Sequence, residues 1–250
     1  MLKLSDYSRN IFSQFGEDGI IQKIFEIIGT SSQVCIDVGA WDGRHLSNTA
    51  NLWLHGWKAF LIESNPKRYA ALIRNTKGRN CYCIKARIAP EGTNTLENVL
   101  RAYDINVIDF LSIDIDGDDY WIFRSLKSLR PRVICCEHNP TIPVHINLIA
   151  EKGNYFGCSV LALHKLAESK KYRLVAMTRT NSFFVSIEDF EKFSAWETSL
   201  IVLAELAIGE VITYYITGYN GDYVLSQQPG FGLGKPYKQK LIGEYFRLGG

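Results

Sequence analysis

The sequence lacks a strong excess of charge, a long uninterrupted apolar run and paired CxxC motifs. Its formal net charge of +2 does not indicate nucleic acid as a partner. The most apolar long stretch, residues 199–217, contains Glu205 and Glu210, and two unpaired carboxylates would be costly in hydrocarbon. We therefore expect a packed helix there, which is a candidate dimer face, and no membrane span.

Cysteines are few and are not arranged to hold structural zinc. Most lie inside apolar, strand-like runs, which is typical of reduced thiols in a protein core. The first ten residues, MLKLSDYSRN, also lack the apolar run of a signal peptide. Both observations predict a cytoplasmic protein. The cysteine positions are 35, 81, 83, 135, 136 and 158.

The stretch VCIDVGAWDG, residues 34–43, predicts a nucleotide-binding corner. Val34 to Asp37 form a short apolar run that closes on a carboxylate, and Gly39 and Gly43 allow a tight turn into a helix. About twenty residues later a second apolar run ends on Glu63, where such folds place an acid for ribose hydroxyls. The turn and the acid together indicate adenosine.

The residues of the turn narrow the choice of cofactor. Dinucleotide sites use Gly-x-Gly-x-x-Gly, whereas this turn reads Gly-Ala-Trp-Asp-Gly and would repel a pyrophosphate. The ammonium and sulfonium groups of S-adenosylmethionine suit a corner that carries Asp37 and Asp42. The turn resembles the first motif of the class I methyltransferases, in which two hydrophobic residues, Asp, a hydrophobic residue and Gly follow one another.

The segment SQFGED, residues 13–18, precedes apolar residues at helical spacing that end near Gly29. This motif ahead of the glycine turn resembles the FkbM-like group of class I methyltransferases, and the resemblance extends from about Phe12 to Ile187. It implies that a helix over residues 16–28 covers the cofactor. The alternative is that Glu17 and Asp18 only provide favourable charge in the first turn of a helix.

The repeated alternation of strand and helix predicts an α/β domain with a mostly parallel sheet. One predicted helix spans Leu46 to Trp57. The resemblance implies a Rossmann-like fold with a seven-stranded sheet, an antiparallel last strand and helices on both faces. We expect a methyltransferase domain over residues 1–187 and an extension over residues 188–250, in which PGFGLGKPY, residues 229–237, is a loop.

A second group of polar residues follows the run FLSI, residues 110–113. Asp114 and Asp116 would face the same side if the strand continues, because side chains alternate along a strand. Two acids on one side repel each other unless a divalent metal, a sulfonium or a shared proton lies between them. The alternative is a turn and helix cap formed by residues 117–119, with Asp114 bonded to a backbone amide.

The next apolar run, residues 132–136, ends in Glu137, His138 and Asn139. Ends of adjacent parallel strands meet at one edge, so these side chains would join Asp114 and Asp116 and suit Mg²⁺ or Mn²⁺. The arrangement resembles metal-dependent small-molecule O-methyltransferases, although His138 replaces the expected Asn. In the alternative, His138 forms a hydrogen bond within its loop. The candidate metal ligands are Asp114, Asp116, Glu137 and His138.

We therefore expect an enzyme that transfers the sulfonium methyl group of S-adenosylmethionine to a hydroxyl of a small molecule, such as a sugar or nucleotide-sugar. Asp116 or His138 would be the base, or a metal would lower the hydroxyl pKa. Expected cofactor-binding residues are Gln14, Glu17, Asp18, Asp37, Gly39, Ala40, Asp42, Gly43, Asn48, Glu63, Ser64, Arg87 and Asp114.

Two other functions stay open at this point. The sequence DIDGD, residues 114–118, is similar to the Asp-x-Asp motifs of metal-dependent phosphohydrolases and nucleotide-sugar transferases. A non-catalytic scaffold that binds the cofactor and uses the C-terminal extension for a partner is the third hypothesis.

Overall fold

A computed structural model of the chain describes residues 1–103, 105–208, 215–217, 219 and 223–225. It divides into two units, Met1–Gly209 and Glu210–Gly250. In the second unit, β8 (Tyr215–Thr217) pairs with β9 (Tyr223–Leu225) in an antiparallel ribbon. The loop expected at residues 229–237 lies outside the described residues.

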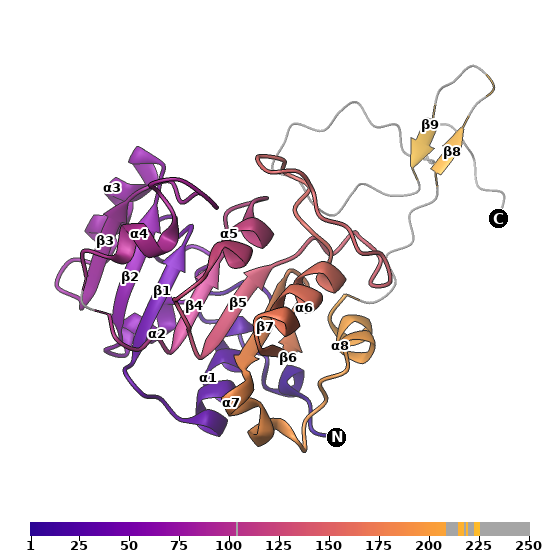
Figure 1. The fold of residues 1–250 in the computed structure, drawn as a ribbon, viewed down its shortest axis with the longest axis horizontal. Coiled ribbons are helices and arrows are strands. Elements are labelled where there is room, and N and C mark those ends of the chain that lie inside the picture. Colours follow the sequence, from indigo (N-terminus) through magenta and orange to yellow (C-terminus); the bar gives the residue numbers. More distant parts are fainter. Residues whose placement is uncertain (104, 209–214, 218, 220–222, 226–250) are drawn as a thin grey trace. The chain divides into compact units, whose positions relative to one another are not determined.

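The first unit contains a seven-stranded sheet with the strand order β3-β2-β1-β4-β5-β7-β6 (Figure 1). The five strands from β3 to β5 are parallel, and β7 is antiparallel to both of its neighbours. This confirms the predicted mostly parallel sheet with an antiparallel last strand. The strands are β1 (Val34–Val38), β2 (Lys58–Glu63), β3 (Cys81–Lys85), β4 (Phe110–Ile113), β5 (Val133–Glu137), β6 (Tyr172–Met177) and β7 (Asn181–Ser186).

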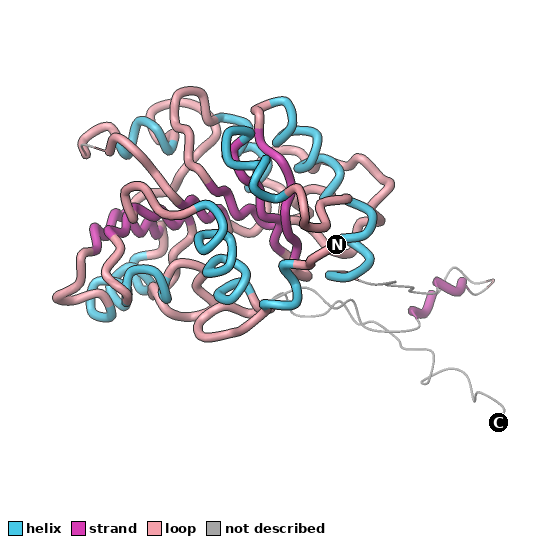
Figure 2. Tube along the Cα trace, turned by 90° about the horizontal axis from the view of Figure 1, so that it is seen from below, coloured by secondary structure: helices cyan, strands magenta, loops and turns pink. Residues whose placement is uncertain are grey.

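Helices cover both faces of the sheet, as Figure 2 shows with the strands between two layers. Alternation along each strand explains the two resulting cores: in β1, Ile36 packs with the cluster on one face and Cys35 with the cluster on the other. The helices are α1 (Glu17–Ile28), α2 (Ala50–Leu54), α3 (Pro66–Asn75), α4 (Leu96–Leu100), α5 (Asp119–Ser125), α6 (Val160–Ser169), α7 (Ile187–Phe190) and α8 (Leu200–Ala207), with 3-10 turns η1 (Leu4–Tyr7) and η2 (Glu191–Phe193).

Helix α8 packs against β6, and its residues Leu203 and Ala204 join the core of the first unit. This compact unit, Met1–Gly209, thus includes α8. The division into a methyltransferase domain and an extension at residue 188 stays a prediction. No helix in the described part of the chain combines the length and the apolar character needed to cross a membrane. All six cysteines are free thiols.

The helix predicted over Leu46–Trp57 is shorter than expected and begins only at Ala50. Leu46 has a φ of +52°, which a right-handed helix does not allow. The Ser47 hydroxyl instead accepts hydrogen bonds from the backbone N–H groups of Thr49 and Ala50, at 3.2 and 3.0 Å. The segment before α2 is consequently a turn, and it places the hydroxyls of Ser47 and Thr49 next to the Asp37 carboxylate of β1.

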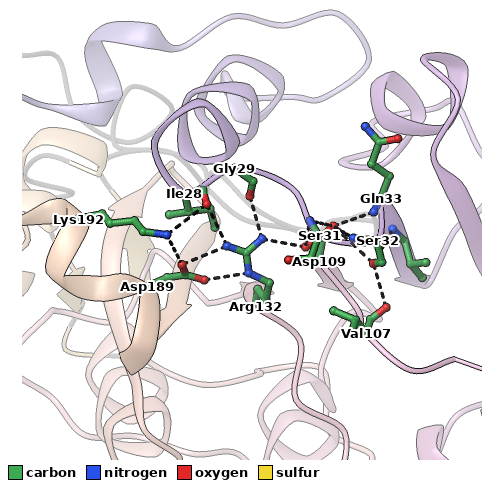
Figure 3. A network of polar contacts seen from close by, with 11 residues as sticks. Ile28, Gly29, Ser31, Ser32, Gln33, Val107, Asp109, Arg132, Asp189 and Lys192 are labelled. Carbon is green, nitrogen blue, oxygen red and sulfur yellow. Dashed lines mark hydrogen bonds and ion pairs between the residues drawn. The ribbon is translucent and has the colours of Figure 1, made fainter.

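A buried polar network joins four segments at the amino ends of the central strands (Figure 3). The Asp109 carboxylate accepts hydrogen bonds from the backbone N–H groups of residues 31–33 and from Arg132. The Arg132 guanidinium also pairs with Asp189 at 2.9 Å and donates to the carbonyl oxygens at the end of α1. This network fixes α1, β4, β5 and α7 relative to one another at the edge opposite the polar strand ends.

Candidate active site

The polar strand ends meet at the carboxyl edge of the sheet. Parallel pairing aligns Val38 with Ile62 and with Ile113, and aligns Ile113 with Cys136. The residues that follow these positions are Gly39, Glu63, Asp114 and Glu137. The strand order reverses between β1 and β4, and in open α/β sheets ligands bind at such a reversal.

The turn after β1 packs too closely on β4 to admit a side chain at residue 39. Gly39 has a φ of +98°, and a Cβ atom built on it would lie 1.7 Å from the Asp114 carbonyl oxygen. Gly43 also has a positive φ of +81°, and its Cβ would lie 2.7 Å from Leu72 Cδ1 of α3. Close packing against backbone therefore requires glycine at residue 39, and the positive φ favours glycine at both positions.

Glu63 fastens this turn to the end of β2. Its buried carboxylate accepts a hydrogen bond from the Trp41 N–H at 3.0 Å and another from the Asn65 N–H at 2.6 Å. Ser64 and Arg87 are exposed near the ends of β2 and β3. The Asp42 carboxylate accepts bonds from the N–H groups of residues 44 and 45 and so shapes its own turn.

Asp37 lies buried below the turn. Its carboxylate accepts hydrogen bonds from the Thr49 and Ser47 hydroxyls at 2.7 and 3.4 Å. Burial raises the pKa of Asp37 to about 6, although the two hydroxyls act in the opposite direction. Asn48 lies beside this group, where its amide donates weakly to Ser112 and to the Cys135 thiol.

The acids of the N-terminal motif have partners within the protein. Glu17 is 0% exposed, and its carboxylate accepts bonds from the N–H groups of Gln14 and Phe15 and from Thr178 Oγ1 and Asn181 Nδ2. One oxygen of Asp18 accepts three backbone N–H bonds from residues 11–13, each at 2.8 Å. Both acids thus hold the segment before α1 in place, while Gln14 is exposed. Covering of the cofactor by α1 stays a prediction.

Asp114, Asp116 and Glu137 form a group of carboxylates whose ligand atoms lie within 4.8 Å of one another. None of the ion pairs among the described residues involves them. Burial, together with the neighbouring acids, raises the pKa values of Asp114 and Glu137 well above their usual range. The group therefore favours occupancy by a cation or a proton.

The residues after Asp116 form a turn into α5, as the alternative for this motif expected, but no side chain caps the start of that helix. Asp116 itself has a φ of +59° and is exposed. The Asp119 carboxylate accepts bonds from the N–H groups of Ile115 and Gly117, each at 2.8 Å. The Asp119 carboxylate thus closes the turn ahead of α5, and Asp114 and Asp116 lie close together at the same turn.

His138 lies outside the carboxylate group. It is 2% exposed. Its backbone N–H donates to the Thr180 carbonyl oxygen at 2.7 Å, and its ring Nδ1 is 3.0 Å from the Ser182 hydroxyl. Burial lowers its pKa to about 3, so the imidazole is neutral. Glu137 and His138 are adjacent at a strand end, and adjacent side chains point to opposite faces.

Several residues around the site were not predicted from the sequence. Ser47 and Thr49 bind Asp37, and Thr178 and Asn181 bind Glu17. These are small polar side chains without a local pattern. The only sign of such partners was the acids themselves, since each buried acid requires hydrogen-bond donors from elsewhere in the chain.

Comparison with protein families gives one match: the methyltransferase FkbM domain, over residues 84–173. This segment runs from β3 to the start of β6 and includes the carboxylate group, α5 and β5. No curated protein matches the sequence significantly.

Several solved structures are similar to this chain at low identity. An amino pentose methyltransferase from Micromonospora echinaspora, solved with S-adenosylmethionine bound, is 11% identical, with a TM-score of 0.42 over 68% of this chain and 89% of that chain. An S-adenosylmethionine-dependent methyltransferase from Clostridium acetobutylicum is 9% identical, with a TM-score of 0.44 over 68% and 90%. Precorrin-6y C5,15-methyltransferase from Geobacter metallireducens is 18% identical, with a TM-score of 0.39 over 72% and 92%.

Three features agree with a class I methyltransferase fold: the strand order, the glycine turn after β1 and the segment that matches the FkbM domain. The match over this segment confirms the resemblance indicated by the sequence motifs: residues 84–173 are similar to the methyltransferase FkbM domain.

Proposed function

We propose that the protein transfers the methyl group of S-adenosylmethionine to a hydroxyl of a sugar or sugar-containing small molecule. The observation that carries this proposal is the meeting of the glycine turn, Glu63 and the carboxylate group at one edge of the sheet. The FkbM domain match supports methyl transfer, and the acidic edge supports a hydroxylated, uncharged acceptor.

The residues of the turn fit the cofactor. A carboxylate offers about four lone-pair sites, and Glu63 uses two of them for the N–H groups of Trp41 and Asn65. The remaining sites would accept the ribose hydroxyls. Asp37 and Asp42 give the corner negative potential, which favours the ammonium and sulfonium groups. The cofactor supplies the activated methyl group, and the protein orients the acceptor against it.

Asp116 is the better base of the two residues that the sequence suggested. It is exposed at the edge, where an acceptor hydroxyl can reach it. His138 is enclosed, with only 2% of its surface exposed, so an acceptor hydroxyl cannot reach it.

A divalent cation fits the three carboxylates at this edge. Asp114, Asp116 and Glu137 present only oxygen ligands, which Mg²⁺ and Mn²⁺ prefer, and a cation would relieve the repulsion that raises their pKa values. Such a cation would favour the deprotonated form of a nearby hydroxyl, and Asp116 would then be a ligand instead of a base.

Calorimetric titration with S-adenosylmethionine tests the cofactor site. We expect micromolar binding by the wild-type protein and about tenfold weaker binding by Glu63→Gln, because the amide keeps one acceptor but loses the charge. Glu188→Gln, an exposed acid on α7, is the matched control and should bind normally. Absence of binding by the wild-type protein would overturn the proposed function and favour assays for phosphatase and nucleotide-sugar transferase activity.

Titration with Mn²⁺, followed by the electron paramagnetic resonance signal of the free ion, tests the cation site. Glu137→Gln should weaken Mn²⁺ binding by at least about tenfold, since one of three charged ligands is lost. Its affinity for S-adenosylmethionine should stay within about twofold of the wild-type value. Equal losses of affinity for Mn²⁺ and for S-adenosylmethionine would contradict a cation site that is separate from the cofactor site.

A further inference from the structure

A loop over residues 139–157, which lies within the connection from β5 to α6, exposes two consecutive aromatic side chains. Tyr155 is 88% exposed and Phe156 is 69% exposed. The loop lies beyond the carboxyl end of β5, beside α5 (Figure 1). Large aromatic side chains are usually buried, and those held at the surface next to a site commonly contact a ligand.

The loop is fixed to the rest of the unit at several points. The Asn139 side chain donates to the Phe156 carbonyl oxygen at 3.0 Å, and the Asn139 N–H donates to the Cys158 carbonyl oxygen at 2.9 Å. Trp121 Nε1 donates to the Ala150 carbonyl oxygen at 3.0 Å. The two aromatic residues therefore occupy a defined place, since the backbone on each side of them is held.

That place is next to the carboxylate group. Gly117 directly follows Asp116, and a Cβ atom built on Gly117 would lie 2.6 Å from the Asn154 carbonyl oxygen and 3.3 Å from the Tyr155 Cα. In addition, the Gly153 N–H donates to the Asp118 carboxylate at 2.7 Å. The loop backbone at residues 153–155 is thus packed against the turn that carries Asp116.

We propose that Tyr155 and Phe156 form a platform for the ring of the acceptor, which the adjacent carboxylates bind through its hydroxyls. This inference rests on the proposed function and assigns these two residues to substrate recognition. A pyranoside matches both parts, because its hydroxyls donate to carboxylates and its C–H face packs on an aromatic ring. The negative charge of the neighbouring carboxylates would repel a polyphosphate or a nucleic acid from this loop.

The test uses the full chain, S-adenosylmethionine and a panel of methyl pyranosides of glucose, galactose, mannose, fucose and rhamnose. Methyl transfer is measured with each, together with the ring signals of tyrosine and phenylalanine in NMR titrations. For a pyranoside that is methylated, we expect the double variant Tyr155→Ala/Phe156→Ala to raise KM by about tenfold, with kcat within about twofold.

Conservative and remote variants separate recognition from stability. Tyr155→Phe and Phe156→Tyr keep the rings and should retain the wild-type KM. Tyr7→Ala removes an exposed aromatic residue of η1, outside the loop, and should also leave KM unchanged. Binding of S-adenosylmethionine should be equal in all of these proteins.

Three results would overturn the inference while leaving the proposed function intact. In the first, the wild-type protein binds S-adenosylmethionine but no pyranoside of the panel shifts the ring signals or is methylated. In the second, the double variant keeps the wild-type KM. In the third, the double variant changes the sedimentation coefficient from that of a dimer to that of a monomer, which would assign the aromatic residues to contact with a second copy. Failure of the wild-type protein to bind S-adenosylmethionine would instead contradict the proposed function itself.

Discussion

Gly39→Ala is expected to lower the free energy of unfolding by about 3 kcal/mol or more and to weaken binding of S-adenosylmethionine by more than about tenfold. An alanine Cβ would lie 1.7 Å from the Asp114 carbonyl oxygen, which is backbone and cannot rotate away. The turn or β4 must therefore move, and Asp114 would move with it. Urea denaturation and calorimetric titration measure the two effects.

Gly56→Ala provides the matched control for Gly39→Ala. Gly56 has nearly the same backbone angle, with a φ of +97°, but a Cβ atom built on it meets nothing within 4 Å. Its substitution should cost only the conformational term, about 1–2 kcal/mol, and should leave cofactor binding unchanged. Equal losses in the two variants would show that close packing between the turn and β4 is unimportant.

Arg132→Met is expected to lower the free energy of unfolding by about 3–5 kcal/mol, measured by urea denaturation. Arg132 neutralises Asp109, which is 0% exposed at its side chain, and also Asp189 (Figure 3). Methionine fills a similar volume but leaves Asp109 enclosed without a cation, while Asp189 keeps only the half-exposed Lys192. Because the network lies at the opposite edge of the sheet, the folded variant should bind S-adenosylmethionine with wild-type affinity.

Lys192→Met is the matched control for the network. Lys192 also pairs with Asp189, at 2.8 Å, but its side chain is 46% exposed, and an exposed pair contributes only about 0–1 kcal/mol. A loss as large as that of Arg132→Met would indicate that Asp189 depends on Lys192 and not on the buried guanidinium.

The fold was predictable because its strands carry clear signals. The run VCIDV is apolar throughout except for Asp37, as expected for a strand covered by helices on both faces. An acid stands at the carboxyl end of three of the parallel strands, namely Glu63 of β2, Asp114 after β4 and Glu137 of β5. The position of the functional edge followed from the parallel arrangement of these strands. The grouping of Asp114, Asp116 and Glu137 agrees with that reasoning.

Other features depend on contacts between distant segments. The helix predicted from Leu46 was shortened because Ser47 and Thr49 bind Asp37, which lies on a different element. His138 was expected beside Glu137, but pairing of β5 with β7 turns it toward Ser182. The aromatic residues of the 139–157 loop had no periodic pattern, and their position follows from long-range bonds such as that between Asn139 and Phe156.

The hydrogen bonds of Glu17 have a consequence for the order in which the chain folds during synthesis. Its carboxylate is enclosed by Thr178 and Asn181, which lie 161 and 164 residues later in the sequence. During synthesis from the N-terminus, these donors emerge long after Glu17 does. The acid therefore stays hydrated until β7 is available, and the segment before α1 closes only as the sheet is completed. We therefore expect the segment before α1 to become ordered only after the turn between β6 and β7 has formed.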